Sequence, residues 1–271
     1  MPERDLPHSP QLIADHALLC AAVRDAGALA LGYFQTDLKH WDKGKDDPVS
    51  EADHAVNDLL HARLQGTRPD YGWLSEETED DPTRLTCDHV WVIDPIDGTR
   101  AFIKGKPHFT ICAALVQKGA PVCAAVFNPA TDEFFEATRG GGATLNGVPI
   151  SPSTRDEIAG CRMAAFAPMF KHPAWPEPWP EMEMVDRNSV AYRLVLVANG
   201  YVDACLALNR KNDWDLAAAD LIVREAGGRI TTHDGATLVY NKPFTKHRSL
   251  LAAGPDLYNV LFDKVGQITL P

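Results

Sequence analysis

The stretch WVIDPIDGTRAF, residues 91–102, places two acidic residues at the end of a predicted buried strand. Four apolar residues, 90–93, lead into Asp94 and Asp97, with Pro95 between them and Gly98 directly after. A buried carboxylate without a partner costs several kcal/mol. The pattern therefore predicts that positive charge meets both carboxylates at the end of this strand.

The overall charge of the chain limits its partners. Its 271 residues, 45% of them hydrophobic, are enough for one large hydrophobic core or two smaller ones. The chain carries 26 Lys and Arg against 37 Asp and Glu, a net charge of −11. Nucleic acids are held by many basic side chains, so this balance predicts no nucleic-acid partner. An acidic protein can still bind anions where a metal ion reverses the local charge.

The six cysteines are scattered along the chain and form no CxxC pair. They are Cys20, Cys87, Cys112, Cys123, Cys161 and Cys205. This distribution is typical of reduced, buried cysteines in a cytosolic protein and predicts neither a disulfide framework nor a zinc site. The first ten residues, MPERDLPHSP, contain no apolar segment, and no run of 18 apolar residues occurs. We therefore expect a cytoplasmic protein without a membrane partner.

Helical and strand patterns alternate in blocks, which favours a layered α/β or α+β architecture. The patterns predict helices at 11–34, 51–65, 189–200 and 212–226, strands at 71–75, 87–94, 161–168 and 201–208, and a series of short strands from 109 to 150. Ser50 with Asp53 resembles a capping box at the second helix. A change of pattern near residue 150 predicts two halves, 1–150 with most of the acidic motifs and 151–271 completing the site, which act as one unit.

Pairs of acidic residues occur where three elements begin or end. The pairs are Glu76 with Glu77, Asp94 with Asp97, and Asp213 with Asp215. Each pair alone has an ordinary explanation, such as a solvated loop, a turn or a favourable helix dipole. Together, on one rim of a sheet, they are typical of a site for Mg²⁺, which prefers oxygen ligands. Two such ions about 3.5–4 Å apart can clamp an in-line phosphoryl displacement.

The segment WVIDPIDGT resembles the signature of the lithium-sensitive, Mg²⁺-dependent inositol monophosphatase superfamily. Three further segments resemble family motifs in the family's order: KGKDDPVSEAD (43–53), WLSEE (73–77) and WDLAAAD (214–220). The resemblance covers about residues 12 to 255. It implies an αβαβα sandwich, a homodimer, and hydrolysis of a small phosphorylated substrate by in-line attack of water activated by two or three Mg²⁺ ions.

The resemblance also implies a role for each motif residue. The first metal would be bound by Glu76, Asp94 and the backbone carbonyl of Ile96, and the second by Asp94, Asp97 and Asp215. Thr99, backed by Asp53, would orient and deprotonate the attacking water. The substrate side of the site would comprise Asp97, Gly98, Thr99, Arg100 and Asp215, with the Gly98 and Thr99 amides facing the phosphate. Lys43 and Glu77 resemble charges that lie just behind the metal ligands.

The sequence leaves the substrate open. DGTRAF differs from the DGTxNF of inositol phosphatases, and Ala207 and Leu208 stand where that branch carries a glutamate for sugar hydroxyls. The basic residue Arg100 is more like histidinol-phosphate phosphatases and 3′(2′),5′-bisphosphate nucleotidases. Arg210 and Lys211 either meet a second phosphate or form a solvated loop.

Further alternatives are fructose-1,6-bisphosphatase activity and a catalytically inactive binding or regulatory homologue. The Pro- and Trp-rich segment 171–181 is either a lid, a dimer contact or a packed surface loop.

Overall fold

The computed structural model describes residues 9–44, 48–173 and 175–270. The predictions for the first eight residues, for residues 45–47 of the 43–53 motif and for residue 174 of the 171–181 loop lie outside this range. Within the described residues, none of the helices combines the length and the apolar character that a membrane crossing requires.

A seven-stranded sheet forms the centre of the amino-terminal half, in the order β3-β4-β5-β6-β7-β8-β9. Its strands are β3 (Gly72–Ser75), β4 (His89–Asp97), β5 (Thr110–Gln117), β6 (Ala120–Asn128), β7 (Glu133–Thr138), β8 (Gly142–Leu145) and β9 (Val148–Pro149). β3 and β4 are parallel, whereas the later neighbours pair antiparallel. Alternate residues of β4 enter different cores, Trp91 on one face and Val92 on the other, so the sheet is covered on both sides.

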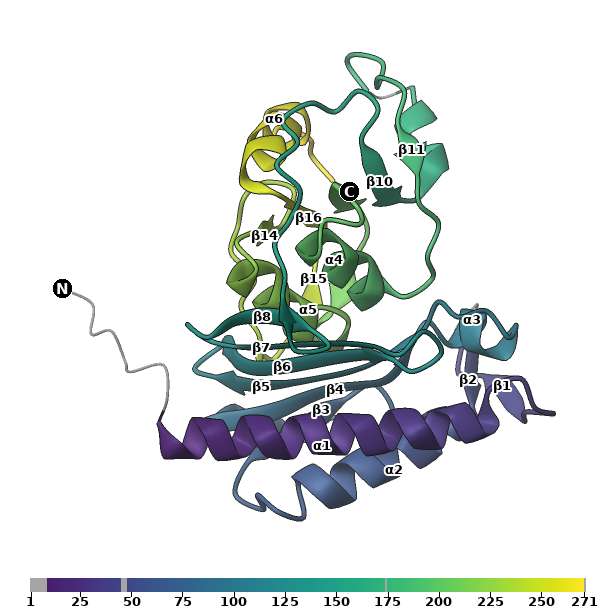
Figure 1. Cartoon of the computed structure of the whole chain (residues 1–271), viewed down its shortest axis with the longest axis vertical. Helices are drawn as coiled ribbons and strands as arrows, with labels where there is room; N and C mark the ends of the chain where they lie inside the picture. Colours follow the sequence, from purple (N-terminus) through teal and green to yellow (C-terminus); the bar gives the residue numbers. More distant parts are fainter. Residues whose placement is uncertain (1–8, 45–47, 174, 271) are drawn as a thin grey trace.

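Two helices, α1 (Pro10–Tyr33) and α2 (Glu51–Leu64), cover one face of this sheet (Figure 1). α1 begins after Ser9, whose Oγ accepts the Leu12 N–H at 3.1 Å. α2 begins after Ser50, whose backbone N–H donates to Asp53 Oδ2 at 2.8 Å, as the predicted capping box requires. The ribbon β1 (His40–Asp42) with β2 (Pro48–Ser50) connects the two helices. Asp53 therefore has a fixed orientation from the first turn of its helix.

The other face of the sheet packs on α4 (Val190–Ala198) and α5 (Asp213–Glu225), and a second sheet lies beyond them (Figure 1). Its strands, in spatial order, are β11 (Glu183–Met184), β10 (Arg162–Ala165), β12 (Ala204–Ala207), β16 (Leu250–Ala253) and β14 (Arg229–Thr231). α6 (Pro255–Val265) covers the outer face of this sheet. Short elements complete the chain: 3₁₀ turns Pro82–Thr86 and Ala167–Lys171, α3 (Thr99–Ile103), and the pair β13 (Lys211–Asn212) with β15 (Lys246–His247).

Three hydrophobic cores fill the four interfaces between the five layers, because the core around α4 and α5 contacts both sheets. This arrangement confirms the predicted αβαβα class. The two sheets lie on either side of residue 150 in the chain. The division into halves 1–150 and 151–271 remains a prediction. The two halves are not separate in space, because α5 from the second half packs directly on the first sheet.

Candidate active site

The acidic motif residues line one cavity of about 450 Å³ at the end of β4. Its walls are formed by Pro48, Glu76, Asp94, Ile96, Asp97, Gly98, Thr99, Arg100, Asn188, Arg210, Lys211 and Asp215. Every predicted metal-binding and substrate-binding position is in this set. The residues come from β2, β4, α3, β13 and α5, and from the segments directly after β3 and before α4 and β13. Asp53 lies behind Thr99, with which it shares a hydrogen bond.

The end of β4 is irregular, and this irregularity places Asp94 and Asp97 at the same cavity. The pairing of β4 with β5 shifts register between these two residues, so the strand bulges there. Gly98 follows with φ of +99°, and a Cβ at this position would lie 2.7 Å from the His108 carbonyl oxygen. Glycine is therefore required for the turn from β4 into α3.

The start of α4 holds Asp97 in place. Asp97 Oδ2 accepts hydrogen bonds from Ser189 Oγ and from the Ala191 N–H, both at 2.6 Å. Ser189 is fully buried and also caps α4, because its Oγ accepts the Tyr192 N–H at 2.9 Å. One carboxylate oxygen of Asp97 is thus fixed by protein donors, and Asp97 lines the cavity.

Asp215 and Glu76 close the cavity from two other elements. Asp215 lies in the first turn of α5, and its Oδ2 accepts the Asn212 N–H at 2.8 Å. Glu76 follows β3, and its Oε1 lies 3.4 Å from Lys43 Nζ. The same ammonium contacts Glu77 Oε1 at 2.7 Å, so Lys43 and Glu77 form the predicted charged pair behind the site.

Thr99 and Asp53 form a buried hydroxyl–carboxylate pair beside the acids. Thr99 Oγ1 lies 3.0 Å from Asp53 Oδ1 and 3.0 Å from the carbonyl oxygen of Ile96. The second oxygen of Asp53 accepts the Ser50 N–H at 2.8 Å and the Ser50 hydroxyl at 2.5 Å. Asp53 is 1% exposed, and its hydrogen bond with the Thr99 hydroxyl connects it to the cavity.

Burial and mutual repulsion raise the pKa values of the four cavity carboxylates. Burial raises the pKa of Glu76 to about 8, although Lys43 opposes the change. It raises the pKa of Asp215 to about 7, and the charge of Asp97 adds to the effect. The pKa of Asp94 is raised by burial and then by Glu76, Asp97 and Asp215. Burial also raises the pKa of Asp97, although Ser189 and Ala191 oppose the rise by donating hydrogen bonds.

The donor set fits divalent cations. Asp94 Oδ1 is buried and accepts no hydrogen bond from the described residues, so one of the most costly atoms to bury lacks a protein partner. The carboxylates stand apart around the cavity walls. Among the described residues, no three of them have ligand atoms that all lie within 4.8 Å of one another. Hard oxygen donors around an open cavity are the surroundings that Mg²⁺ prefers.

The structure changes one expectation about neighbouring residues and adds to two others. Asp213 does not line the cavity, because its carboxylate accepts the Asn241 N–H and lies 2.8 Å from His247 Nε2. Arg210 and Lys211 line it, with Arg210 exposed to solvent and Lys211 partly buried. None of the described residues in 171–181 lines it, and Trp175 and Trp179 pack at the outer core, as a surface loop would.

Two residues of the site, Asn188 and Ser189, lie outside the sequence motifs. The run SVAYRLVLVA carries a serine directly before an apolar helical pattern, which is a sequence signal for an N-cap. The contact of this cap with Asp97, 92 residues earlier, has no local signal.

Comparison with known proteins agrees with this geometry. The family model described as "Inositol monophosphatase family" matches residues 14–269. An "Inositol-1-monophosphatase" of Rhizobium meliloti is 36% identical over 71% of this chain and 75% of its own length. A "Nus factor SuhB" of Xylella fastidiosa is 34% identical over 81% of this chain and 82% of its own length.

Solved structures show the same fold. The extragenic suppressor protein suhB of Bartonella henselae aligns with a TM-score of 0.79 at 28% identity, over 93% of this chain and 98% of its own. The Thermotoga maritima IMPase aligns with a TM-score of 0.77 at 27% identity, over 92% of this chain and 95% of its own. The match to the family model extends over nearly the whole chain and includes the residues of the acidic cavity. The chain therefore belongs to the inositol monophosphatase family.

Proposed function

We propose that this protein is a cytoplasmic, homodimeric, lithium-sensitive phosphomonoesterase that uses Mg²⁺ to hydrolyse a small phosphate ester. The observation that carries the proposal is the convergence of four carboxylates beside a hydroxyl–carboxylate pair. One of the four has a buried oxygen with no hydrogen-bond partner among the described residues. Carboxylates bind cations, and a buried hydroxyl–carboxylate pair moves a proton. Both are needed for hydrolysis of a phosphate ester by water.

The metal-binding positions are those implied by the family motifs. Two or three Mg²⁺ ions would be held by Glu76, Asp94, the Ile96 carbonyl, Asp97 and Asp215. When bound, Mg²⁺ supplies positive charge to the phosphate and the departing oxygen and lowers the pKa of water. The carbonyl of Ile96 is positioned for this role because Ile96 itself is anchored in the core under α1 and α2.

The proton path uses the protein's own groups. Thr99 Oγ1 donates to Asp53 Oδ1, so its lone pairs can accept a hydrogen bond from the attacking water and orient it. A threonine hydroxyl is a poor base alone, and Asp53 behind it takes up the proton. Burial raises the pKa of Asp53, which makes its carboxylate a stronger proton acceptor. The Gly98 and Thr99 amides at the cavity wall would bind the phosphate oxygens.

Two basic residues favour a second candidate within the same reaction class. Arg210 and Lys211 line the cavity together with the acidic cluster, and Arg100 lines it as well. The positive charge of these side chains complements a second anionic group on the substrate. A 3′(2′),5′-bisphosphate nucleotidase has such a substrate, whereas histidinol phosphate and inositol phosphate do not.

Several relatives are named "Nus factor". This name raises a further candidate function of another class, namely a binding or regulatory role that does not require catalytic turnover. Intact acidic motifs at every expected position argue for retained catalysis.

The proposal is tested by phosphatase assays with Mg²⁺ on inositol phosphate, histidinol phosphate, adenosine 3′,5′-bisphosphate and fructose bisphosphate. Asp94→Asn should lower kcat by about 100-fold or more, because cation binding at this carboxylate supplies several kcal/mol of transition-state stabilisation. Glu79→Gln, an exposed acid three residues after Glu76 and outside the cavity, is the matched control and should be neutral. Full turnover by Asp94→Asn at saturating Mg²⁺ would reject the metal role, and no turnover of any ester would favour the non-catalytic candidate.

A further inference from the structure

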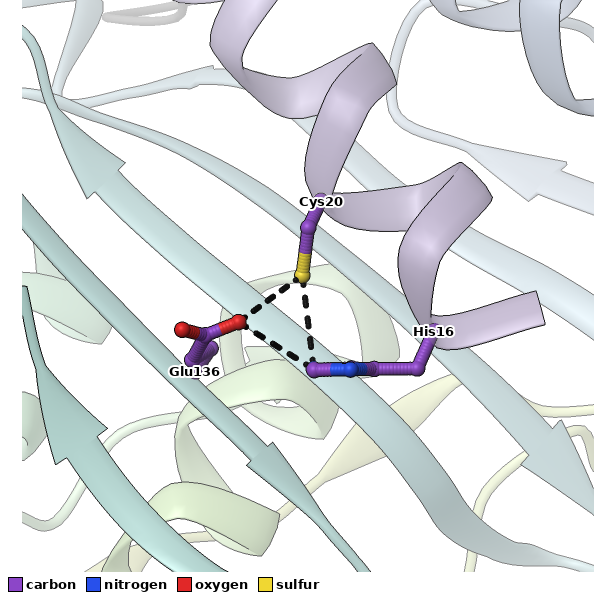
Figure 2. A group of neighbouring side chains, drawn as sticks. All are labelled: His16, Cys20 and Glu136. Carbon is purple, nitrogen blue, oxygen red and sulfur yellow. Dashed lines mark hydrogen bonds and ion pairs between the residues drawn. The ribbon is translucent and has the colours of Figure 1, made fainter. Parts of the chain in front are cut away.

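A second group of metal-binding side chains lies between α1 and β7. His16 and Cys20 are four residues apart on α1, so they project from the same face of the helix. Glu136 lies on β7, and Figure 2 shows its carboxylate pointing toward the imidazole and the thiol. None of the three lines the acidic cavity. They form the only group of three in the described part of the chain whose ligand atoms all lie within 4.8 Å of one another.

The separations of the three ligand atoms match those of a tetrahedral metal site. Cys20 Sγ lies 3.3 Å from His16 Nε2 and 3.2 Å from Glu136 Oε2, and the nitrogen and the oxygen are 3.4 Å apart. Zinc bound at its usual N, O and S distances in a tetrahedron would place these ligand atoms about 3.4–3.6 Å from one another. Small shifts of a few tenths of an ångström therefore suffice to close the three atoms around an ion.

The surroundings leave room for a fourth ligand. The side chains of His16 and Glu136 are each 24% exposed, so water reaches the open side of the triangle. Glu136 is on the face of β7 that it shares with Phe134, which is packed in the core under α1. Thr144 Oγ1 lies 3.5 Å from Glu136 Oε1 and supports the second oxygen of the carboxylate.

We propose that His16, Cys20 and Glu136 bind a thiophilic divalent cation, with Zn²⁺ as the best match, and that the ion clips α1 to the β7 strand. A mixed set of imidazole, thiolate and carboxylate selects zinc-like ions over Mg²⁺, which prefers oxygen alone. One thiolate and one carboxylate also neutralise the charge of a divalent ion. Water occupies the fourth position.

Binding displaces the thiol proton. Without an ion, the Cys20 thiol donates to Glu136 Oε2, and burial together with Glu136 raises the pKa of Cys20 well above its usual range. On binding, the S–H bond breaks, the S–metal bond forms and the proton passes to solvent. Burial lowers the pKa of His16, so its imidazole is neutral and ready to act as a ligand. Arg24, which lies over the Phe134 ring, favours the thiolate by its charge.

The proposal differs from the expectation that the cysteines of the chain form no zinc site. Sequence patterns for zinc rely on short spacings between ligands. Here two ligands share a helix face, and the third comes from a strand 116 residues after Cys20. No local motif signals that arrangement.

The test is titration of the full-length protein with Co²⁺ in the presence of excess Mg²⁺, followed by absorption spectroscopy. A cobalt ion bound to a thiolate in a tetrahedral site gives a charge-transfer band and intense d–d bands. We expect one such ion per chain in the wild type, displaced by Zn²⁺. Cys20→Ser should abolish the charge-transfer band, whereas Cys123→Ser should retain it, because the Cys123 thiol donates to the Leu12 carbonyl and is not one of the three grouped ligands.

Two further measurements keep the proposal falsifiable. Glu136→Gln should weaken Co²⁺ binding by about tenfold or more, which covers the case in which Cys20→Ser fails to fold. A folded wild type without a charge-transfer band in a large excess of Co²⁺ would overturn the proposal. A band of undiminished strength in folded Cys20→Ser would also overturn it, and would point to Cys112, the buried thiol whose pKa is raised by the nearby Asp97 and Asp94.

Discussion

At the scale of single residues, the hydroxyl of Thr99 depends on two neighbours that fix its proton. It lies 3.0 Å from Asp53 Oδ1 and 3.0 Å from the Ile96 carbonyl oxygen, and both of these atoms accept hydrogen bonds only. The hydroxyl proton must therefore point to one of them, and the oxygen lone pairs are left for water. Ser50 holds the other oxygen of Asp53 from the helix cap. The orientation of Thr99 thus depends on the start of α2.

Replacing Thr99 tests this arrangement directly. Thr99→Ala removes the hydroxyl and should lower kcat by about 10²–10⁴-fold, the usual contribution of a positioned proton-transfer group. Thr99→Ser keeps the hydroxyl and should retain most of the activity. Steady-state kinetics at saturating Mg²⁺ compare the two. Equal losses in both variants would show that the methyl group rather than the hydroxyl matters.

Residue types and spacing predicted most of the site. Asp94, Asp97 and Thr99 stand within six residues, so their convergence needs only one strand end and one turn. Glu76 and Asp215 were placed by their motifs and by the rule that acids at element ends gather on one rim. The contact of Ser189 with Asp97 was not predictable, because it depends on how α4 docks on β4 across a long sequence separation.

At the scale of elements, the N-cap of α4 combines stability with positioning. Ser189 Oγ accepts the Tyr192 N–H and donates to Asp97 Oδ2. The same hydroxyl therefore caps the start of α4 and holds a carboxylate of the cavity in place. The N-cap of α1 contributes to stability alone. Ser9 Oγ accepts the Leu12 N–H, and Ser9 is exposed.

The two caps provide a matched pair of variants. Ser9→Ala and Ser189→Ala should each lower the free energy of unfolding, by about 1 kcal/mol for the loss of an N-cap. Ser189→Ala should also lower kcat, because Asp97 loses one of its two donors, whereas Ser9→Ala should leave kcat unchanged. Urea unfolding and Mg²⁺-dependent turnover measure both effects. A normal kcat for a destabilised Ser189→Ala would limit Ser189 to its capping role.

Element types were predictable because most patterns are local. The capping residues and apolar periodicity of the segments near 51–65 and 212–226 predict helices that the structure confirms as α2 and α5. The ends of these elements differ from the predictions by only a residue or so. The bulge between Asp94 and Asp97 was not predictable from periodicity, since it arises from the pairing of β4 with β5.

At the scale of the whole molecule, the acidic cavity joins the two parts of the chain. Asp94 and Asp97 belong to the first sheet, whereas Asp215 lies in the first turn of α5, the helix that separates the two sheets. Cations bound among these residues would link layers as well as support chemistry. The layered architecture could be predicted from the alternating blocks of helix and strand. The packing of α5 on the first sheet could not be predicted from the sequence and is seen only in the structure.

This arrangement predicts how stability depends on pH and Mg²⁺. In an unfolded chain the four carboxylates lose their protons by about pH 5. In the folded protein without metal, Asp215 holds its proton to about pH 7 and Glu76 to about pH 8, chiefly because both are buried. The folded state binds more protons than the unfolded state between these limits, so the free energy of unfolding falls as the pH rises through this window.

In EDTA, Tm should therefore be several degrees lower at about pH 8.5 than at about pH 6, and Mg²⁺ should raise Tm more at the higher pH. The reason is that cations relieve the repulsion among carboxylates only when these are ionised. Asp94→Asn removes one charge, so without metal its Tm should fall less across this pH range and respond less to Mg²⁺. Differential scanning calorimetry measures all four conditions for both proteins. A Mg²⁺ effect on the wild type that is equal at both pH values would mean that the carboxylates of the cavity do not bind the ion.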